Sequence, residues 1–483
     1  MTTYQPTLES LKQHPVPQWF HDAKFGIMVS WTLSSVPGWA TPVGSLHEVT
    51  KKFGFEYWFK NNPYSEWYWN SLKIEGSPTR AYHAKTYGDN FPYTDFKELF
   101  IAAAAKWRPE PWADLFARIG AQYVVLITKH HDGFTLWQSA HPNPHCPDFH
   151  AGRDLVGELT DAVRLRGLRM GLYYSGGPDW WFQGDPITDL VSMANAIPQS
   201  DEYARYVDAH WRELIERYKP SIIWNDIGFP AKLDVKALYA DYYNTIPDGV
   251  VNDRSLQADA RKLIRSRLGR ALVRWLLKVV LNTPGSGGIP KNIHADFTTP
   301  EYTSVSKLVA HKWEATRGLG YSFGYNQNET AGHMLSVEQL VRHLVDIVSK
   351  NGNLLLDVGP MADGAIPTLQ LERLEGLGRW LSVNGEAIFA TRPWHIAEAE
   401  TADRLPVRFT QRGDSLYAIL LDTPASAEVR FPSLKFKAGT TVQLLGGERP
   451  LSVDLASSTV RLPEQVTASP AYALKITPLP EAV

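Results

Sequence analysis

Short apolar runs alternate with amphipathic helical patterns over about 350 residues of this chain, and this alternation limits the possible folds most. The runs are continuous rather than alternating apolar and polar, as in strands that are buried on both faces. They cover residues 26–29, 123–128, 169–174, 222–225, 249–252 and 354–358. The helical patterns cover residues 96–107, 112–119, 155–166, 202–218, 235–243, 337–350 and 369–383. This order predicts an α/β fold with a parallel sheet, and the length suits a (β/α)8-like barrel. We expect a distorted barrel, because eight clean units cannot be counted.

The pattern changes after Trp394. Short runs separated by Pro and Gly follow at 407–410, 415–421, 440–445, 459–462 and 471–476. The first two flank Gln411-Arg412-Gly413-Asp414, which is typical of a hairpin turn. We therefore predict two domains, a barrel over residues 1–394 and a small antiparallel β-sandwich over residues 395–483.

Charge and composition exclude several classes of protein. The chain has 49 basic and 51 acidic residues, a formal net charge of -2, which excludes a nucleic-acid binder built on bulk positive charge. It contains no run of about 18 apolar residues, so we predict no membrane-spanning helix. Cys146 is the single cysteine, and the first 18 residues do not resemble a signal peptide. We therefore expect a cytoplasmic location.

Polar residues follow several of the predicted strands. In a barrel of this type, active-site groups lie at the carboxyl ends of the strands. The segments are Thr128-Lys129-His130-His131-Asp132, Tyr173-Tyr174-Ser175, Trp224-Asn225-Asp226 and Asn252-Asp253-Arg254. Asp226 closes an apolar strand, where a buried carboxylate needs partners or a chemical role. An isolated Asp in this position is more often a helix cap or an ion-pair partner, here of Arg254; the surrounding polar rim shifts the interpretation toward a functional site.

The histidines give weak evidence for a metal site. His130 and His131 are adjacent on a strand and should point to opposite faces, so they are a poor chelating pair. His141, His145, Cys146 and His150 lack the paired spacing of zinc sites. We predict no metal and no cofactor; a metal-dependent hydrolase that uses this histidine-rich loop is a remaining alternative.

Seven segments together resemble the α-L-fucosidases of glycoside hydrolase family 29, in order from about residue 18 to 394. They are Lys24-Phe25-Gly26-Ile27, Ser35-Val36-Pro37, Ser65-Glu66-Trp67-Tyr68, Lys129-His130-His131-Asp132-Gly133-Phe134, Tyr173-Tyr174-Ser175, Trp224-Asn225-Asp226 and the run from Asn351 to Pro360. The resemblance implies a distorted (β/α)8-like barrel with a C-terminal β-sandwich. It also implies a retaining, exo-acting α-L-fucosidase that works by double displacement through a covalent fucosyl-enzyme intermediate. The implied substrates are fucosylated small glycosides or oligosaccharides, the reaction needs no metal, and we expect a homo-oligomer.

The resemblance also implies roles for individual residues. Asp226 matches the nucleophile, and Glu301 resembles the general acid/base, with Glu66 as the second candidate for that role. The residues expected to contact the sugar are Ser30, Glu66, Trp67, His130, His131, Tyr173, Trp224, Arg254 and Phe323. Among these, Arg254 is expected beside the nucleophile and Phe323 against the methyl group of fucose.

Ser30 departs from the family pattern, because the resemblance leads us to expect a histidine that contacts fucose there. Serine is shorter, so this contact would be lost or bridged by water. We predict a changed affinity or specificity rather than an inactive enzyme, unless Ser30 lies off the sugar and the change is harmless. A fucose-binding protein with weak or lost catalysis is the second hypothesis.

The segment between Arg254 and Glu301 is longer than the resemblance leads us to expect. Residues 261–281 contain seven basic and no acidic residues. The apolar side chains of this segment recur at helical spacing at Leu268, Leu272, Trp275, Leu276 and Val279. A basic amphipathic helix can bind a membrane or a partner. We favour a lid or a subunit contact against an acidic surface.

Overall fold

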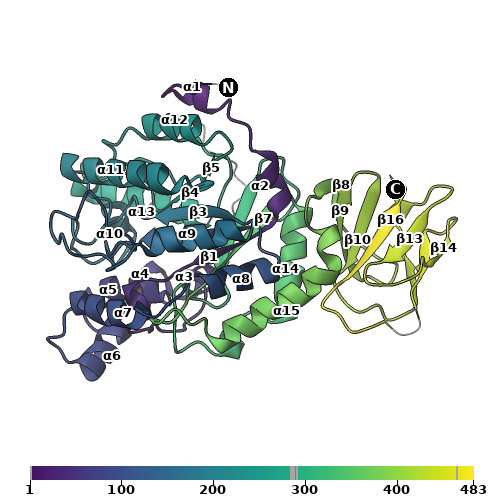
Figure 1. Cartoon of the computed structure of the whole chain (residues 1–483), viewed down its shortest axis with the longest axis horizontal. Coiled ribbons are helices and arrows are strands. Elements are labelled where there is room, and N and C mark those ends of the chain that lie inside the picture. Colours follow the sequence, from purple (N-terminus) through teal and green to yellow (C-terminus); the bar gives the residue numbers. More distant parts are fainter. Residues whose placement is uncertain (1–2, 283–288, 290–291, 464–465) are drawn as a thin grey trace.

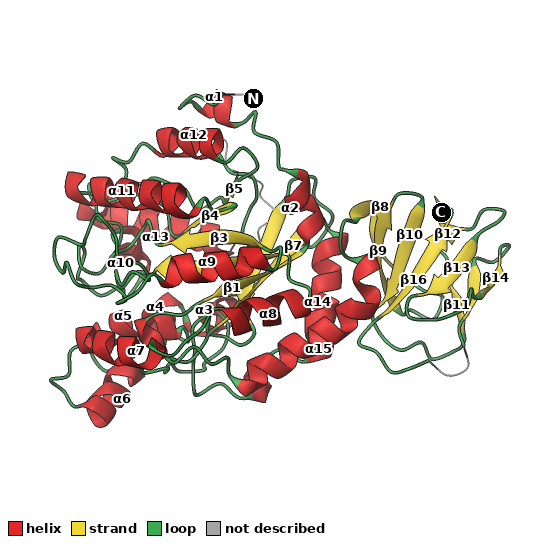
Figure 2. Ribbon diagram, viewed as in Figure 1, coloured by secondary structure: helices red, strands yellow, loops and turns green. Residues whose placement is uncertain are grey.

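A computed structural model shows the chain as a barrel-like α/β unit followed by antiparallel sheets (Figures 1 and 2). It describes residues 3–282, 289, 292–463 and 466–483. Seven parallel strands form one curled sheet in the order β5-β4-β3-β2-β1-β7-β6. They are β1 (Phe25–Val29), β2 (Tyr123–Lys129), β3 (Arg169–Tyr174), β4 (Ile222–Asn225), β5 (Val250–Val251), β6 (Trp313–Gly318) and β7 (Gly352–Val358). Six of them lie at the predicted runs.

A short extended segment, residues 297–301, joins the two edge strands of this sheet. Phe297 forms a parallel bridge with Asn252, directly after β5. On the other side, Glu301 forms a parallel bridge with Thr316 of β6. The segment thus takes the eighth position of the barrel, and the predicted distorted (β/α)8-like architecture is confirmed. β6 was not predicted, because Glu314 and Arg317 interrupt its apolar pattern.

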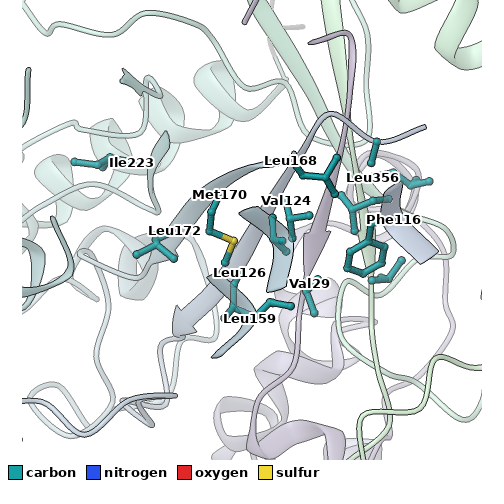
Figure 3. Packing of buried hydrophobic residues seen from close by; sticks show 14 of the residues in the cluster. Val29, Phe116, Val124, Leu126, Leu159, Leu168, Met170, Leu172, Ile223 and Leu356 are labelled. Atoms are coloured by element: carbon teal, nitrogen blue, oxygen red, sulfur yellow. The ribbon is translucent and has the colours of Figure 1, made fainter. Parts of the chain in front are cut away.

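The strands pack two separate cores, because successive side chains of a strand point to opposite faces of the sheet. Figure 3 shows outward-facing residues such as Val124, Leu126 and Leu172 together with Phe116 and Leu159 from the surrounding helices. The intervening residues fill the interior of the barrel, among them Met28, Tyr123, Val125, Ile127, Tyr173, Ile222, Trp224 and Leu355. A one-residue shift in register would exchange these two sets, so burial fixes which side chains point inward.

Helices surround the barrel as the periodic patterns predict. The predicted ones are α7 (Phe96–Ala104), α8 (Glu110–Arg118), α9 (Leu155–Leu165), α11 (Asp201–Tyr218), α12 (Val235–Thr245), α14 (Val337–Ser349) and α15 (Thr368–Asn384). Shorter ones are α1 (Leu8–Leu11), α2 (Gln18–Ala23), α3 (Leu46–Phe53), α4 (Phe55–Lys60), α5 (Tyr68–Lys73), α6 (Pro78–Tyr87) and α10 (Leu190–Ala194). Several begin with a side-chain cap; Ser200, for example, accepts a hydrogen bond from the Tyr203 amide at the start of α11.

The C-terminal region forms antiparallel sheets, as predicted. A five-stranded sheet has the order β13-β16-β10-β9-β8, and smaller sheets pair β11-β15-β14 and β12-β17. The strands are β8 (Arg392–Glu400), β9 (Pro406–Arg412), β10 (Ser415–Leu420), β11 (Glu428–Arg430), β12 (Leu434–Lys435), β13 (Thr441–Leu444), β14 (Ser452–Asp454), β15 (Thr459–Arg461), β16 (Tyr472–Thr477) and β17 (Glu481–Ala482). Gly413, in the predicted hairpin turn between β9 and β10, has a φ of 58°. The predicted division after residue 394 falls inside β8.

β10 shows how the C-terminal sheet attaches to the barrel. Leu416, Ala418 and Leu420 pack into the sandwich core. Tyr417 and Ile419 point the other way and join the main core around the barrel. In Figure 1, α14 and α15 lie between the barrel and the C-terminal sheets. The strand is therefore buried on both faces, which explains its continuous apolar sequence.

The basic insert forms the predicted helix, α13 (Arg267–Asn282), which packs against α10. Val273 is buried, but the apolar stripe through Leu268, Leu272 and Trp275 is exposed to solvent. Within the described residues, no helix is both long enough and apolar enough to cross a membrane.

Candidate active site

A cavity of about 180 Å³ lies at the carboxyl ends of the barrel strands. Every second residue of a strand faces the barrel interior, and the cavity residues follow this alternation. Met28 faces the interior and Ser30, two positions later, lines the cavity; Trp224 and Asp226 are related in the same way. Strand periodicity therefore aims these side chains at one point. The cavity is lined by Met28, Ser30, Leu46, Phe55, Trp58, Phe59, Tyr64, Glu66, Trp67, Ile127, His130, His131, Tyr173, Met193, Trp224, Asp226, Ile227, Arg254, Glu301, Thr316 and Phe323.

Three hydrogen-bond donors converge on the carboxylate of Asp226. Tyr173 donates its hydroxyl to Oδ2 at 2.7 Å, and Arg254 donates Nη1 to Oδ1 at 2.7 Å. The backbone amide of Ile227 also donates to Oδ1, at 2.9 Å. Ile227 adopts a φ of 54°, an uncommon left-handed conformation for a β-branched residue. The carboxylate is therefore held in one orientation at the end of β4.

Arg254 holds a second carboxylate, that of Glu301. Its Nη2 lies 2.9 Å from Oε2 of Glu301, so one guanidinium joins Glu301 and Asp226. The other oxygen of Glu301, Oε1, accepts a hydrogen bond from the buried hydroxyl of Tyr64 at 3.0 Å. Glu301 ends the segment that closes the barrel, and its side chain is about 24% exposed against 11% for Asp226. Two carboxylates thus face one cavity, with Glu301 nearer to solvent.

His130 and His131 both contribute neutral imidazoles to the cavity, so the expectation that they point to opposite faces was wrong: β2 ends at Lys129 and both residues follow it. Burial lowers the pKa of both rings well below 6.5. The Ser175 hydroxyl donates to the carbonyl of Pro178, so it must accept its 2.6 Å hydrogen bond from Nδ1 of His131. Nε2 of His131 then carries the lone pair, 3.9 Å from Oδ2 of Asp226. Within the described part of the chain this nitrogen and Nδ1 of His130 have no hydrogen-bond partner, so both are suited to bind sugar hydroxyls.

Glu66 and Trp67 enter the cavity from a short 3-10 turn, Ser65–Trp67. Glu66 is buried and accepts a hydrogen bond from the backbone amide of Gly324 at 3.0 Å. Burial raises the pKa of Glu66 to about 7, so this carboxyl is partly protonated near neutral pH. The ring of Phe323, next to Gly324, packs at 5.3 Å against Tyr64 and supplies an apolar wall.

Ser30 lines the cavity floor, but its hydroxyl is engaged with a buried acid. It donates to Oδ2 of Asp357 at 2.7 Å. Burial raises the pKa of Asp357 well above 3.8. Asp357 lies in β7 and was not singled out from the sequence, although it belongs to the long motif that ends at Pro360.

Trp224 lines the cavity with a ring that is fixed from three sides. Its ring stacks on Tyr173 at 5.4 Å, and the guanidinium of Arg254 lies 4.7 Å from its centre. Its indole nitrogen donates to Oε1 of Glu314 at 3.1 Å. This supports the interpretation of Trp224 as a wall of the pocket, whereas Trp31 packs in the core against Trp107 and Trp112.

All eleven residues predicted for the site line this one cavity. Sequence reasoning missed Tyr64, Thr316 and Asp357, and the apolar residues at the cavity mouth. Tyr64 directly precedes the Ser-Glu-Trp motif, so its position was an available signal. Thr316 lies on β6, which the sequence pattern did not predict.

His141 and His150 lie on the outer loop around a different cavity, away from Asp226. Among the residues that the structure describes, no group of three or more His, Cys, Asp or Glu side chains is placed to hold a metal ion.

Comparison with known proteins agrees with this geometry. A family model described as alpha-L-fucosidase matches residues 1–386. The chain belongs to the α-L-fucosidase family. This fucosidase is 32% identical to tissue alpha-L-fucosidase of Homo sapiens over 98% of its own length and 92% of the human protein. It is 32% identical to the alpha-L-fucosidase of Dictyostelium discoideum, over 94% of this chain and 88% of that protein.

Solved structures place the fold of this fucosidase in the same family. The alpha-fucosidase of Thermotoga maritima in complex with fucose superimposes with a TM-score of 0.82 at 44% identity, covering 98% of this chain and 100% of that one. The same Thermotoga enzyme in complex with a mechanism-based inhibitor gives a TM-score of 0.83, over 98% of this chain and 99% of that one. The family assignment makes the protein a glycoside hydrolase.

Proposed function

We propose that this fucosidase is a retaining, exo-acting enzyme that removes terminal α-L-fucose from small glycosides or oligosaccharides. The observation that carries the proposal is the single guanidinium of Arg254, which joins Asp226 and Glu301 across one cavity. Retaining glycosidases use two carboxyl groups only ~5–5.5 Å apart, and inverting enzymes a wider pair that leaves room for a water. Two carboxylates on one guanidinium fit the closer arrangement.

Asp226 acts as the nucleophile in this mechanism. Its oxygen attacks the anomeric carbon while the bond to the leaving-group oxygen breaks, which forms a covalent fucosyl-enzyme ester. The donors from Tyr173, Arg254 and Ile227 hold the carboxylate in one orientation for this attack. A Thermotoga maritima relative bound to a mechanism-based inhibitor supports a covalent step.

Glu301 acts as the general acid and then as the general base. In the first step it gives its proton to the leaving-group oxygen, and in the second it takes a proton from the water that cleaves the ester. Its position near solvent favours it over Glu66, because the proton must be exchanged between turnovers and the leaving group departs outward. Glu66, buried and bonded to the Gly324 amide, is better placed to bind a sugar hydroxyl.

Replacement of Asp226 by glycine tests the assignment of the nucleophile. We expect Asp226→Gly to abolish hydrolysis of an aryl α-L-fucoside, and azide to restore part of the turnover by replacing the missing nucleophile. Near-normal turnover without azide would show that the site is wrongly assigned. A protein that binds fucose but shows no turnover between pH 4 and 8 would favour the fucose-binding alternative. Activity that is lost with a chelator would favour the metal-dependent alternative.

The general acid/base is tested by comparing Glu301→Ala with Glu66→Ala. We expect Glu301→Ala to lose the basic limb of the pH–rate profile and to respond to azide, since a small anion can enter the space left above the sugar. Glu66→Ala should raise KM and keep both limbs. The reverse pattern would assign the role to Glu66.

We also propose that the protein works in the cytoplasm as a homo-oligomer, with α13 as a subunit contact. Leu268, Leu272, Trp275 and Val279 follow each other at spacings of four, three and four, the seam of a helix pair. The side chains of the first three are more than 40% exposed. Light scattering of Leu272→Glu against the parent chain tests the contact, and a smaller species is expected for the variant. Fractionation of the source cells tests the location.

A further inference from the structure

The mouth of the active-site cavity is apolar on the side away from the floor. Leu46 of α3, Phe55 of α4 and Met193 of α10 line it and are only partly buried, whereas Ser30, His130 and His131 deeper in the cavity are buried. The three mouth residues pack on one aromatic cluster that includes Trp58 and Phe59 of α4. We call Leu46, Phe55 and Met193 the apolar collar.

The collar lies where the leaving group must pass. Ser30 and Met28 line the cavity at its buried end, so the fucose ring enters first and its substituent at the anomeric carbon points outward. Glu301, the proposed proton donor to that substituent, is also the more exposed of the two carboxylates. The atoms beyond the glycosidic oxygen therefore meet the collar.

The two proposed reacting carboxylates at the cavity are already paired with one guanidinium. Arg254 is bonded to Asp226 and Glu301, and the collar residues carry no charge. Apolar and aromatic surfaces bind the C–H face of an uncharged sugar ring, with hydroxyls left at the edge for solvent.

α13 supports the apolar collar through its contact with α10. It packs against α10, the helix that carries Met193, and Arg274 of α13 lies 3.3 Å from Asp189, the residue that caps α10. The basic insert thus belongs to the structure that shapes the leaving-group side of the pocket.

We propose that the apolar collar is the binding site for the leaving group, and that it selects an uncharged sugar ring packed by its apolar face against Phe55 and Met193. This inference rests on the proposed function, because it places the anomeric carbon between Asp226 and Glu301. The collar contributes to recognition of the leaving group and not to the bond-breaking steps.

The test compares substrates with and without a ring in the leaving group. α-L-Fucosyl fluoride has none, 4-nitrophenyl α-L-fucoside has an aryl ring, and a third substrate is the fucosyl disaccharide that the parent enzyme cleaves fastest among the 1→2, 1→3, 1→4 and 1→6 linkages. For Phe55→Ala and for Met193→Ala, we expect the ratio of kcat/KM for each ring-bearing substrate to kcat/KM for the fluoride to fall five- to tenfold. This factor lies below the roughly 10- to 200-fold that one methylene is worth in a closed hydrophobic pocket, because the collar residues are only partly buried.

Two matched controls lie two residues away from the tested positions and outside the cavity lining. Phe53→Ala removes an exposed ring at the end of α3, and Val191→Ala shortens a neighbour of Met193 on α10. Both should leave the ratios within twofold of the parent value.

Equal losses of kcat/KM on all three substrates would overturn the proposal that the collar binds the leaving group, because the variants would then be disturbing the fucose pocket itself. A change in the aryl ratio alone would overturn the assignment of a sugar ring. Unchanged kcat/KM ratios for both variants would show that the collar does not bind the leaving group. If the parent chain hydrolyses none of the three substrates, the proposed function fails instead, which is a separate result.

Discussion

Tyr64→Phe tests the chemistry of Glu301 through a group that does not itself transfer a proton. The Tyr64 hydroxyl is buried and donates to Oε1 of Glu301 at 3.0 Å. Phenylalanine keeps the ring, which packs against Trp58, Tyr302 and Phe323. The substitution therefore removes one hydrogen bond and little packing.

The size of the effect follows from the charge that develops on Glu301. As Glu301 gives up its proton in the first step it becomes a carboxylate, and the Tyr64 donor stabilises that charge in the transition state. A hydrogen bond to a charged group contributes about 1.5–3 kcal/mol. Because the side chain of Glu301 is about 24% exposed, water replaces part of the stabilisation that the Tyr64 hydrogen bond provides. We therefore expect the lower end, about 1.5–2 kcal/mol, which corresponds to a roughly 10- to 30-fold loss of kcat/KM at about 1.4 kcal/mol per factor of ten.

The assay is a series of aryl α-L-fucosides whose leaving groups differ in pKa. Tyr64→Phe should lose most activity on poor leaving groups, which need the proton, and least on dinitrophenyl fucoside, which does not. Tyr302→Phe is the matched control, since its hydroxyl donates to the carbonyl of Tyr321 and does not contact Glu301. An equal loss for good and poor leaving groups would refute the reasoning, because the hydroxyl would then act on something other than proton transfer.

Two further predictions concern the buried acids around the site. Ser30→Ala leaves Oδ2 of Asp357 without its 2.7 Å donor and should lower the free energy of unfolding by about 1–2 kcal/mol in urea titrations. Ser30→Thr keeps the hydroxyl and should retain the stability of the parent chain. If the alanine variant is as stable as the parent, this hydrogen bond does not stabilise the fold. Burial raises the pKa of Glu314 to about 7, although Tyr123 and Trp224 donate to it. Since its folded pKa is raised, its favourable contribution is present below about pH 4.5 and is lost as the pH rises through 7, a change of about 3.5 kcal/mol at about 1.4 kcal/mol per pH unit. The free energy of unfolding should therefore fall between about pH 4.5 and 7, and Glu314→Gln should flatten this fall; an unchanged slope would show that Glu314 does not titrate in this range.

The sequence by itself determined six of the seven strands of the barrel sheet and, through the resemblance of its motifs, most of the site. Continuous apolar runs such as 169–174 and 222–225 identified β3 and β4 to the residue, because burial on both faces leaves a local signature. The same strands ended in polar residues, and step-two periodicity carried Trp224 and Asp226 to the inner face. These predictions required only information within a few residues of each position.

The tertiary structure alone decided how distant segments complete the site. Residues 297–301 carry no apolar run, and they become the eighth strand position only because β5 and β6 leave a gap that bridges at Asn252 and Thr316 can close. Tyr64 meets Glu301 across 237 positions of sequence, and Ser30 meets Asp357 across 327. Such pairs depend on the register of the whole barrel. A local pattern shows that a polar group is buried, but the closed fold decides which partner satisfies it.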